Sequence, residues 1–233
     1  MDVPRYHTAL IVGAGPGLSA SLARLCADAG MNVALAARNT EKLAELCADT
    51  NASAYACDAR DAYAVAGLFD QVEARQGTPD LVVYNAAARV PGPVTDLDPG
   101  AVRLALEVSA FGAFLVAQQA ARRMLPKGHG AIAFTGATAG VKGFANTSCF
   151  AMGKFALRGL AQSLARELSP RGIHVVHVVI DGGIRAETRP DPADAPDSTL
   201  DPGAIAQTYW HVLHQHRSAW SWEVELRPWV EQF

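Results

Sequence analysis

A lysine in the second half of the chain, Lys154, is the first residue whose surroundings indicate chemistry. It closes the stretch C-F-A-M-G-K (149–154), one turn of a predicted helix after Phe150. Burying a lysine is costly unless its charge is used. The alternative is a side chain that extends along the helix to reach water. The apolar context F-A-M-G-K-F-A-L favours the inward position, so we predict that Lys154 faces a ligand site.

A glycine-rich segment, G-A-G-P-G-L-S (13–19), joins the first predicted strand to the first predicted helix. Gly13, Gly15 and Gly17 allow the backbone to approach a phosphate at the helix start, where free N–H groups and the helix dipole favour an anion. The spacing is G-x-x-x-G-x-S, because Leu18 takes the place of the last glycine in G-x-G-x-x-G. We predict that a dinucleotide binds at this turn.

The end of the second predicted strand bears on the choice of dinucleotide. A site for NAD carries an acidic residue about 20 residues after the glycine turn, where it accepts from the ribose hydroxyls. Here Ala37 is followed by Arg38, and arginine can pair with a 2′-phosphate. We therefore predict NADP (NADPH) in preference to NAD, with a solvated arginine as the alternative. Asp58 could accept from an adenine amino group or cap the next helix.

Apolar runs alternate with helical stretches along the chain. Strands are predicted at 7–12, 31–37, 52–57, 80–85, 131–136, 172–180 and 222–228, and helices at 16–30, 39–49, 61–76, 98–124, 147–168 and 201–215. Continuously apolar strands between helices indicate a parallel sheet covered on both faces. The predicted fold class is α/β: one doubly wound Rossmann-type domain over residues 1–233, with about seven strands.

The segment 186–203 differs from the rest, because it is rich in proline and aspartate and has no periodicity. Such a segment is either a mobile substrate lid or a disordered surface loop.

Composition excludes several classes of function. The chain has 233 residues, 50% hydrophobic and 18% charged, with a net charge of −3, so no basic surface indicates nucleic acid. No apolar run of about 18 residues and no signal peptide is present, which predicts a cytoplasmic protein without a membrane partner. The histidines form no metal-ligand set, so no metal is expected. No C-x-x-C spacing occurs among the four cysteines, which we interpret as reduced thiols: Cys26, Cys47, Cys57 and Cys149.

In order and spacing, these segments resemble the short-chain dehydrogenase/reductase family from about Thr8 to Ile184. The segments that carry the resemblance are V-G-A-G-P-G-L-S (12–19), C-D-A-R-D (57–61), D-L-V-V-Y-N-A-A (80–87), V-S-A-F-G-A-F (108–114), A-I-A-F-T-G-A-T-A-G (131–140), F-A-M-G-K-F-A-L (150–157) and D-G-G-I (181–184). The resemblance implies hydride transfer with a nicotinamide cofactor. It also implies cofactor contacts at Asn85, Ala86 and Ile184, and a contact of Lys154 with the nicotinamide ribose.

The family's catalytic set is altered in this chain. It consists of a tyrosine and a lysine four residues apart, a serine thirteen residues before the tyrosine, and an asparagine in the preceding long helix. The corresponding residues here are Phe150, Lys154, Ala137 and Ser109. A phenyl ring has no titratable proton, and a methyl group cannot polarise a carbonyl. Lys154 and Ser109 are therefore the candidate catalytic residues that remain.

No other proton donor occupies the position of the family's tyrosine on the predicted helix. The candidates are Cys149, Thr138, Ser148, Tyr84, a substrate group or water. Two functions stay open. One is an NADP-dependent oxidoreductase with a non-standard site, acting on an activated alkene, an iminium or another unknown small molecule. The other is a catalytically silent NADP-binding sensor or partner subunit. The predicted lid favours the first, and the lost catalytic groups favour the second; we adopt the first because the fold is so commonly an oxidoreductase.

The helices predicted at 98–124 and 147–168 are apolar on more than one face. A second apolar face must be buried somewhere, and family members pair through these helices. We predict a homodimer or homotetramer.

Overall fold

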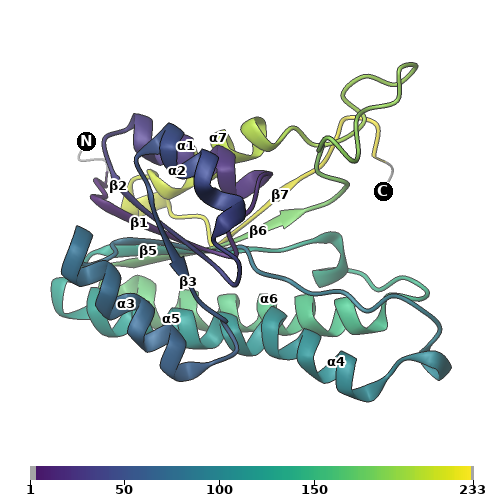
Figure 1. Cartoon of the computed structure of the whole chain (residues 1–233), viewed down its shortest axis with the longest axis horizontal. Coiled ribbons are helices and arrows are strands. Elements are labelled where there is room, and N and C mark those ends of the chain that lie inside the picture. Colours follow the sequence, from purple (N-terminus) through teal and green to yellow (C-terminus); the bar gives the residue numbers. More distant parts are fainter. Residues whose placement is uncertain (1–3, 232–233) are drawn as a thin grey trace.

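Seven strands form one parallel sheet in the order β3-β2-β1-β4-β5-β6-β7. The structure is a computed structural model that describes residues 4–231 (Figure 1). This order confirms the predicted doubly wound Rossmann-type class. The strands are β1 (Thr8–Val12), β2 (Asn32–Ala37), β3 (Ser53–Ala56), β4 (Leu81–Tyr84), β5 (Gly130–Thr135), β6 (Ile173–Ile180) and β7 (Glu223–Leu226).

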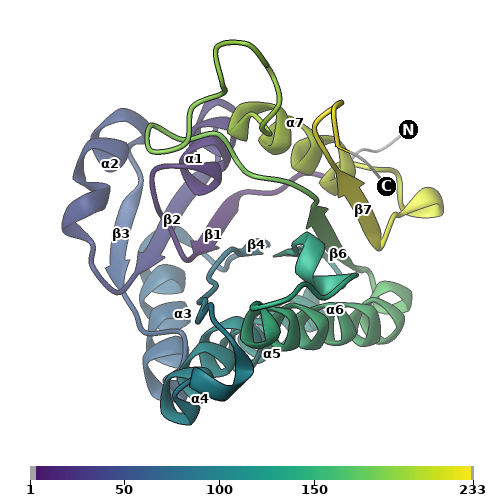
Figure 2. The same cartoon turned by 90° about the vertical axis from the view of Figure 1, so that its right-hand side faces the viewer.

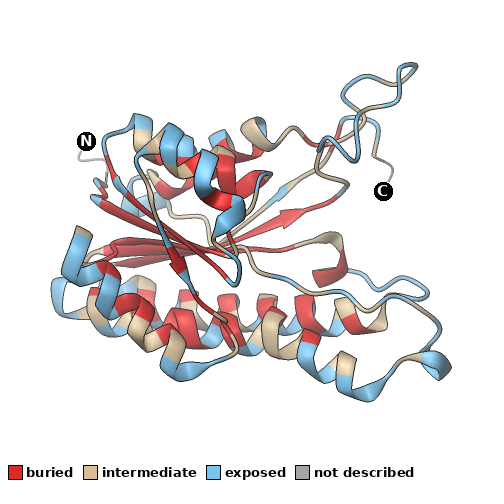
Figure 3. Ribbon diagram, in the orientation of Figure 1, coloured by how far each residue is buried: buried red, intermediate tan, exposed pale blue. Residues whose placement is uncertain are grey.

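Helices cover both faces of the sheet, as Figures 1 and 2 show. On one face lie α1 (Leu18–Asp28), α2 (Ala44–Thr50) and α7 (Pro202–Leu213). On the other lie α3 (Ala62–Gln76), α4 (Pro99–Leu106), α5 (Gly112–Met124) and α6 (Ser148–Leu168). Every residue of β1, β4, β5 and β6 is buried (Figure 3). This burial explains why these strands are continuously apolar instead of alternating.

Aspartate side chains fix where three of the helices begin. The Asp61 carboxylate accepts from the Tyr63 and Ala64 N–H groups at the start of α3, at 2.8 and 3.1 Å. Asp98 and Asp201 cap α4 and α7 in the same way, each followed by a proline in the first helical position. Proline lacks the N–H that a helix start cannot satisfy, so Asp-Pro is a strong start signal.

The helix predicted over 98–124 is present, but its centre departs from α-helical geometry. A π-helical turn, Glu107–Phe111, separates α4 from α5. The Tyr84 hydroxyl donates to the Val108 carbonyl at 2.5 Å, so this carbonyl has a partner outside the regular helical pattern. The chain also passes close to its neighbours here, because a Cβ on Gly112 would lie 2.6 Å from the Tyr84 hydroxyl. Such single-turn π segments often mark functional sites.

The stretch Pro99–Lys127 is long and apolar enough to cross a membrane by length and composition, with a mean hydropathy of 1.6 over its best window and 39% of that window buried. The core helices of soluble proteins pass the same test, so this is weak evidence for a span.

Candidate active site and cofactor site

A crevice opens where the strand order reverses, between β1 and β4. From this point the chain after β1 enters α1 on one face, and the chain after β4 leads to α4 on the other. Doubly wound sheets bind ligands at this position. A cavity of about 250 Å³ lies here and brings together several of the predicted cofactor residues. Those that line it are Gly13, Arg38, Asp58, Asn85 and Ala86.

The glycine turn is packed on one side and open on the other. Gly13 has a φ of +87°, and a Cβ there would lie 2.4 Å from the Ala86 nitrogen. Only glycine fits such a position. At Gly15 and Gly17, by contrast, an added Cβ would meet nothing within 4 Å. The N-terminus of α1 at Gly17 has no side-chain cap, so its N–H groups remain available for a phosphate.

Two further side chains hold this turn in place. The Ser19 hydroxyl donates to the Gly13 carbonyl at 3.2 Å and accepts from the Asn85 amide at 2.7 Å. Asn85 therefore links the end of β4 to the glycine turn. The next cavity along the turn is lined by Gly15, Gly17, Leu18 and Ile184, together with Arg185.

Cations line the part of the crevice at the end of β2. Arg38 is exposed there, and Lys42 lines the same cavity. The sequence analysis missed Lys42, although a lysine four residues after Arg38 was a usable signal. Asp58 is held by Arg60, whose Nη2 lies 2.6 Å from the Asp58 carboxylate. The Arg60 hydrogen bond lowers the pKa of Asp58, so this acid keeps its charge beside the cavity.

Lys154 lies inside the protein, where the apolar context of the sequence placed it. The residue is 3% exposed, and its Nζ donates to the Thr135 carbonyl at 2.6 Å. Burial, with a smaller contribution from the nearby Arg89 cation, lowers its pKa from 10.5 to about 7. An ammonium has three N–H donors, and within residues 4–231 this is the one hydrogen bond it makes. The others are available to a ligand.

Ser109 and Ala137 occupy the positions that the family resemblance assigns to catalytic groups. The Ser109 hydroxyl accepts from the Ala88 N–H at 3.2 Å, which ties the π-helical turn to the chain after β4. The side chain is 1% exposed, and a Cβ on Gly153 would lie 2.8 Å from the Ser109 Cβ. Ala137 follows β5 in an extended conformation and carries only a methyl group. The Ser109 hydroxyl is thus hydrogen-bonded to the loop that borders the crevice.

Three of the replacement proton donors considered from the sequence are engaged elsewhere. Tyr84 is fully buried, donates to the Val108 carbonyl, and has a pKa raised by burial. The Thr138 hydroxyl donates to the Ile180 carbonyl at 3.4 Å. Cys149 is buried, with its sulfur 4.0 Å from the Val102 carbonyl. These contacts leave Lys154 as the titratable group at the family's catalytic position.

Arg89 is a residue of this site that the sequence analysis missed. Its guanidinium carbon lies 4.2 Å from the centroid of the Phe150 ring, where the family carries its tyrosine. The Lys154 Nζ lies 5.8 Å from the same centroid. Burial lowers the pKa of Arg89, with a contribution from the Arg189 cation. The signal available was an arginine four residues after Asn85, but its stacking on Phe150 depends on the tertiary fold.

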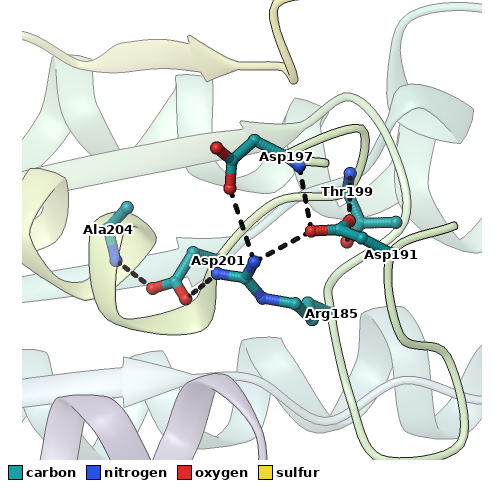
Figure 4. A network of polar contacts seen from close by, with 6 residues as sticks. All are labelled: Arg185, Asp191, Asp197, Thr199, Asp201 and Ala204. Carbon is teal, nitrogen blue, oxygen red and sulfur yellow. Dashed lines mark hydrogen bonds and ion pairs between the residues drawn. The ribbon is translucent and has the colours of Figure 1, made fainter. Parts of the chain in front are cut away.

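The segment 186–203, predicted to be a lid or a disordered loop, is organised around Arg185 (Figure 4). The Arg185 guanidinium pairs with Asp191 at 2.9 Å, with Asp197 at 3.5 Å, and with Asp201. Asp191 also accepts from the Thr199 N–H at 2.9 Å. A backbone bridge joins Ile184 to Leu200, so both ends of the segment meet beside the cofactor cavity. Its mobility stays a prediction.

The chain belongs to the short-chain dehydrogenase family, which it matches over residues 7–193. It is 32% identical over 174 residues to the cis-4-hydroxycyclohexanecarboxylate dehydrogenase of Sinomonas cyclohexanicum, covering 72% of this chain and 70% of that one. It is 30% identical over 200 residues to the 3-oxoacyl-[acyl-carrier-protein] reductase MabA of Mycobacterium avium, covering 85% and 74%.

Solved structures agree with this assignment. A short-chain dehydrogenase from Rhodopseudomonas palustris has a TM-score of 0.83 and 34% identity, covering 97% of this chain and 100% of that one. A metagenomic short-chain oxidoreductase in complex with NADP has a TM-score of 0.82 and 27% identity, covering 95% and 97%. Residues 4–231 contain no group of three or more His, Cys, Asp or Glu side chains that could hold a metal ion.

The buried charge of Lys154 predicts how the stability of the protein changes when the charge is removed. The sign of this change distinguishes a functional role of the ammonium from a structural one. In Lys154→Met the ammonium is lost and the alkyl stem is kept. The lowered pKa of Lys154, about 7 instead of 10.5, reduces the stability of the folded wild type by roughly 4 kcal/mol at pH 7. The hydrogen bond to Thr135, which the variant loses, contributes about 1 kcal/mol. We expect the variant to be more stable by about 1–3 kcal/mol in denaturant unfolding at pH 7.

The difference in unfolding free energy between Lys154→Met and the wild type should shrink as pH rises from about 7 to 10.5. In this window the unfolded wild type binds a proton that the folded protein does not, so wild-type stability rises with pH. Lys127→Met, at an exposed lysine, is the control and should change little. A loss of stability in Lys154→Met at pH 7 would show that the ammonium is a structural group.

Proposed function

We propose that the protein is an NADP-dependent oxidoreductase whose substrate does not require a tyrosine-type proton donor. The observation that carries the proposal is the buried Lys154 ammonium, which makes one hydrogen bond within residues 4–231 and so keeps two N–H donors for a ligand although Phe150 replaces the tyrosine. The open glycine turn at Gly15 and Gly17 supports a cofactor in the same crevice. The NADP complex of a structural relative and the reductases among the curated relatives also support it.

Phe150 and Ala137 restrict the chemistry that this site can perform. When bound, the cofactor supplies or accepts a hydride. An iminium carbon that gains a hydride becomes an amine without needing a proton. An activated alkene that gains a hydride becomes an enolate, which takes its proton from water. In both cases Lys154 holds the nicotinamide ribose, so orientation does not depend on a phenol.

Ordinary ketones should be poor substrates of the wild type, and restoring their reduction should need two changes. Phe150→Tyr supplies a phenol beside the Lys154 cation, which should lower the pKa of the phenol. Without Ala137→Ser the carbonyl oxygen still lacks its second donor. We expect the double variant to gain about 10²-fold or more over the wild type, and clearly more than either single variant.

The measurement is NADPH consumption with simple aldehydes and ketones, beside activated alkenes and iminium compounds. Brisk ketone reduction by the wild type would refute the proposal of a non-standard site. Tight NADPH binding without turnover of any of these substrates would indicate a non-catalytic role.

We also propose that the cofactor is NADP rather than NAD. Arg38 and Lys42 line the cavity next to the end of β2, where a 2′-phosphate would lie. Charge-assisted hydrogen bonds are worth about 1.5–3 kcal/mol, so Arg38→Ala should weaken NADPH binding by about tenfold or more and leave NADH binding nearly unchanged.

Fluorescence titration with both cofactors tests this, with Arg75→Ala, an exposed arginine on α3, as the control. Equal affinity of the wild type for NADPH and NADH would contradict it.

A homodimer through α5 and α6 is a further part of the proposal. Phe111, Phe114 and Phe155 are 49%, 42% and 46% exposed, although they are large and apolar. A cavity of about 230 Å³ beside Phe114 is lined by residues of both helices. An exposed apolar patch of this kind favours a protein interface. Light scattering at micromolar concentration should therefore show a dimer or tetramer.

Phe114→Glu should dissociate this oligomer, because it places a charge in the apolar patch. Tyr63→Glu, at a residue of α3 that is 91% exposed, should not. A wild-type monomer would count against the interface.

A further inference from the structure

Two cations lie beside the Phe150 ring, and a third, from another part of the chain, lies near one of them. Arg89 follows β4, Lys154 lies on α6, and Arg189 lies in the segment after β6. The Arg89 guanidinium carbon and the Lys154 Nζ lie 4.2 and 5.8 Å from the centroid of the ring. Arg189 is close enough to Arg89 for the two charges to repel. Its side chain passes over the turn after β6, with its Cδ 3.2 Å from the position of a Cβ on Gly183.

No carboxylate of the described chain compensates these charges. Within residues 4–231 the Arg89 and Arg189 side chains make no hydrogen bond or ion pair, and Lys154 makes one hydrogen bond, to a neutral carbonyl. A guanidinium offers five N–H donors. The Phe150 ring attracts the Arg89 cation, but it has no oxygen or nitrogen that could accept a hydrogen bond from the guanidinium.

Several acidic residues in the neighbouring segments are already paired with other cations. Three aspartates of the segment 186–203 pair with Arg185, only four residues before Arg189 (Figure 4). On the other side of Lys154, Glu223 is paired with Arg158 at 2.7 Å and hydrogen-bonded to the His177 ring at 2.9 Å. Cations gathered in a crevice without a counter-charge favour binding of an anion.

We infer that the substrate carries an oxyanion, a carboxylate or a phosphate, which binds between Arg89 and Arg189 beside Phe150 and Lys154. This inference rests on the proposed function, because it names the substrate class of the same site. A planar guanidinium binds two oxygens of a carboxylate or phosphate side by side. Phe150 then has a role of its own: it orients Arg89 without the hydroxyl that a tyrosine would place beside the anion.

Calorimetric titration of the full chain saturated with NADP⁺ tests this inference without requiring turnover. The probes are benzoate, phenyl phosphate and the neutral benzamide. Benzoate or phenyl phosphate should bind at least tenfold more tightly than benzamide, and the tighter of the two identifies the anion. Arg89→Met should weaken its binding by about tenfold or more, the value expected for a charged hydrogen-bond partner. Arg166→Met, an exposed arginine of α6, is the matched control and should bind as the wild type does.

Arg189→Met provides a second variant at an exposed loop position, so the test does not depend on the folding of the Arg89 variant. This substitution should weaken binding of the same anion by at least threefold. Equal binding of benzamide and both anions, or anion binding unchanged in Arg189→Met and in folded Arg89→Met, would overturn the inference. Failure to bind NADP⁺ would instead refute the proposed function; the three probes are then titrated into the protein alone, and the same comparison decides the inference.

Discussion

The reversal of strand order between β1 and β4 is the constraint on which the site depends. Connections on opposite faces of a parallel sheet separate at this point, and the crevice between them cannot be filled by either connection. Gly13 makes the reversal possible, because its backbone lies against Ala86 with no space for a side chain. Ser19 and Asn85 then lock the end of β4 to the glycine turn. A closely packed wall therefore stands directly beside an open phosphate site.

Opposite this wall, the active site is formed by α6 and the π-helical turn. Close packing of Gly153 against Ser109 sets the distance between these two elements. Ser109 in turn holds the Ala88 backbone, which precedes Arg89. This series of contacts connects an unusual helix geometry to the placement of a guanidinium over Phe150. Phe150 and Ala137 carry no titratable group at this site, whereas the cations Arg89 and Lys154 lie beside the Phe150 ring.

Much of the architecture could be predicted from the sequence. All seven strands overlap the segments predicted for them, most of which are continuous apolar runs, and the two helices α4 and α7 begin at Asp-Pro pairs. The π-helical turn at Glu107–Phe111 could not be predicted, because the Tyr84 hydroxyl that donates to its Val108 carbonyl comes from a strand more than twenty residues away. The ion pairs of the segment 186–203 with Arg185 were not predicted for a related reason. A run of aspartates indicates a solvated loop unless a cation such as Arg185 is known to lie among them.

The sequence by itself determined the fold class, the glycine turn, and the presence of Phe150 and Ala137 at the positions where the family resemblance places a tyrosine and a serine. These properties depend on residue type and on spacing along the chain. Only the tertiary structure decided how Lys154 is buried, that Ser109 binds backbone, and that Arg89 lies over Phe150. Burial and electrostatic interaction depend on distances in space, and β4, α6 and the segment after β6 approach one another only when the sheet has closed its core.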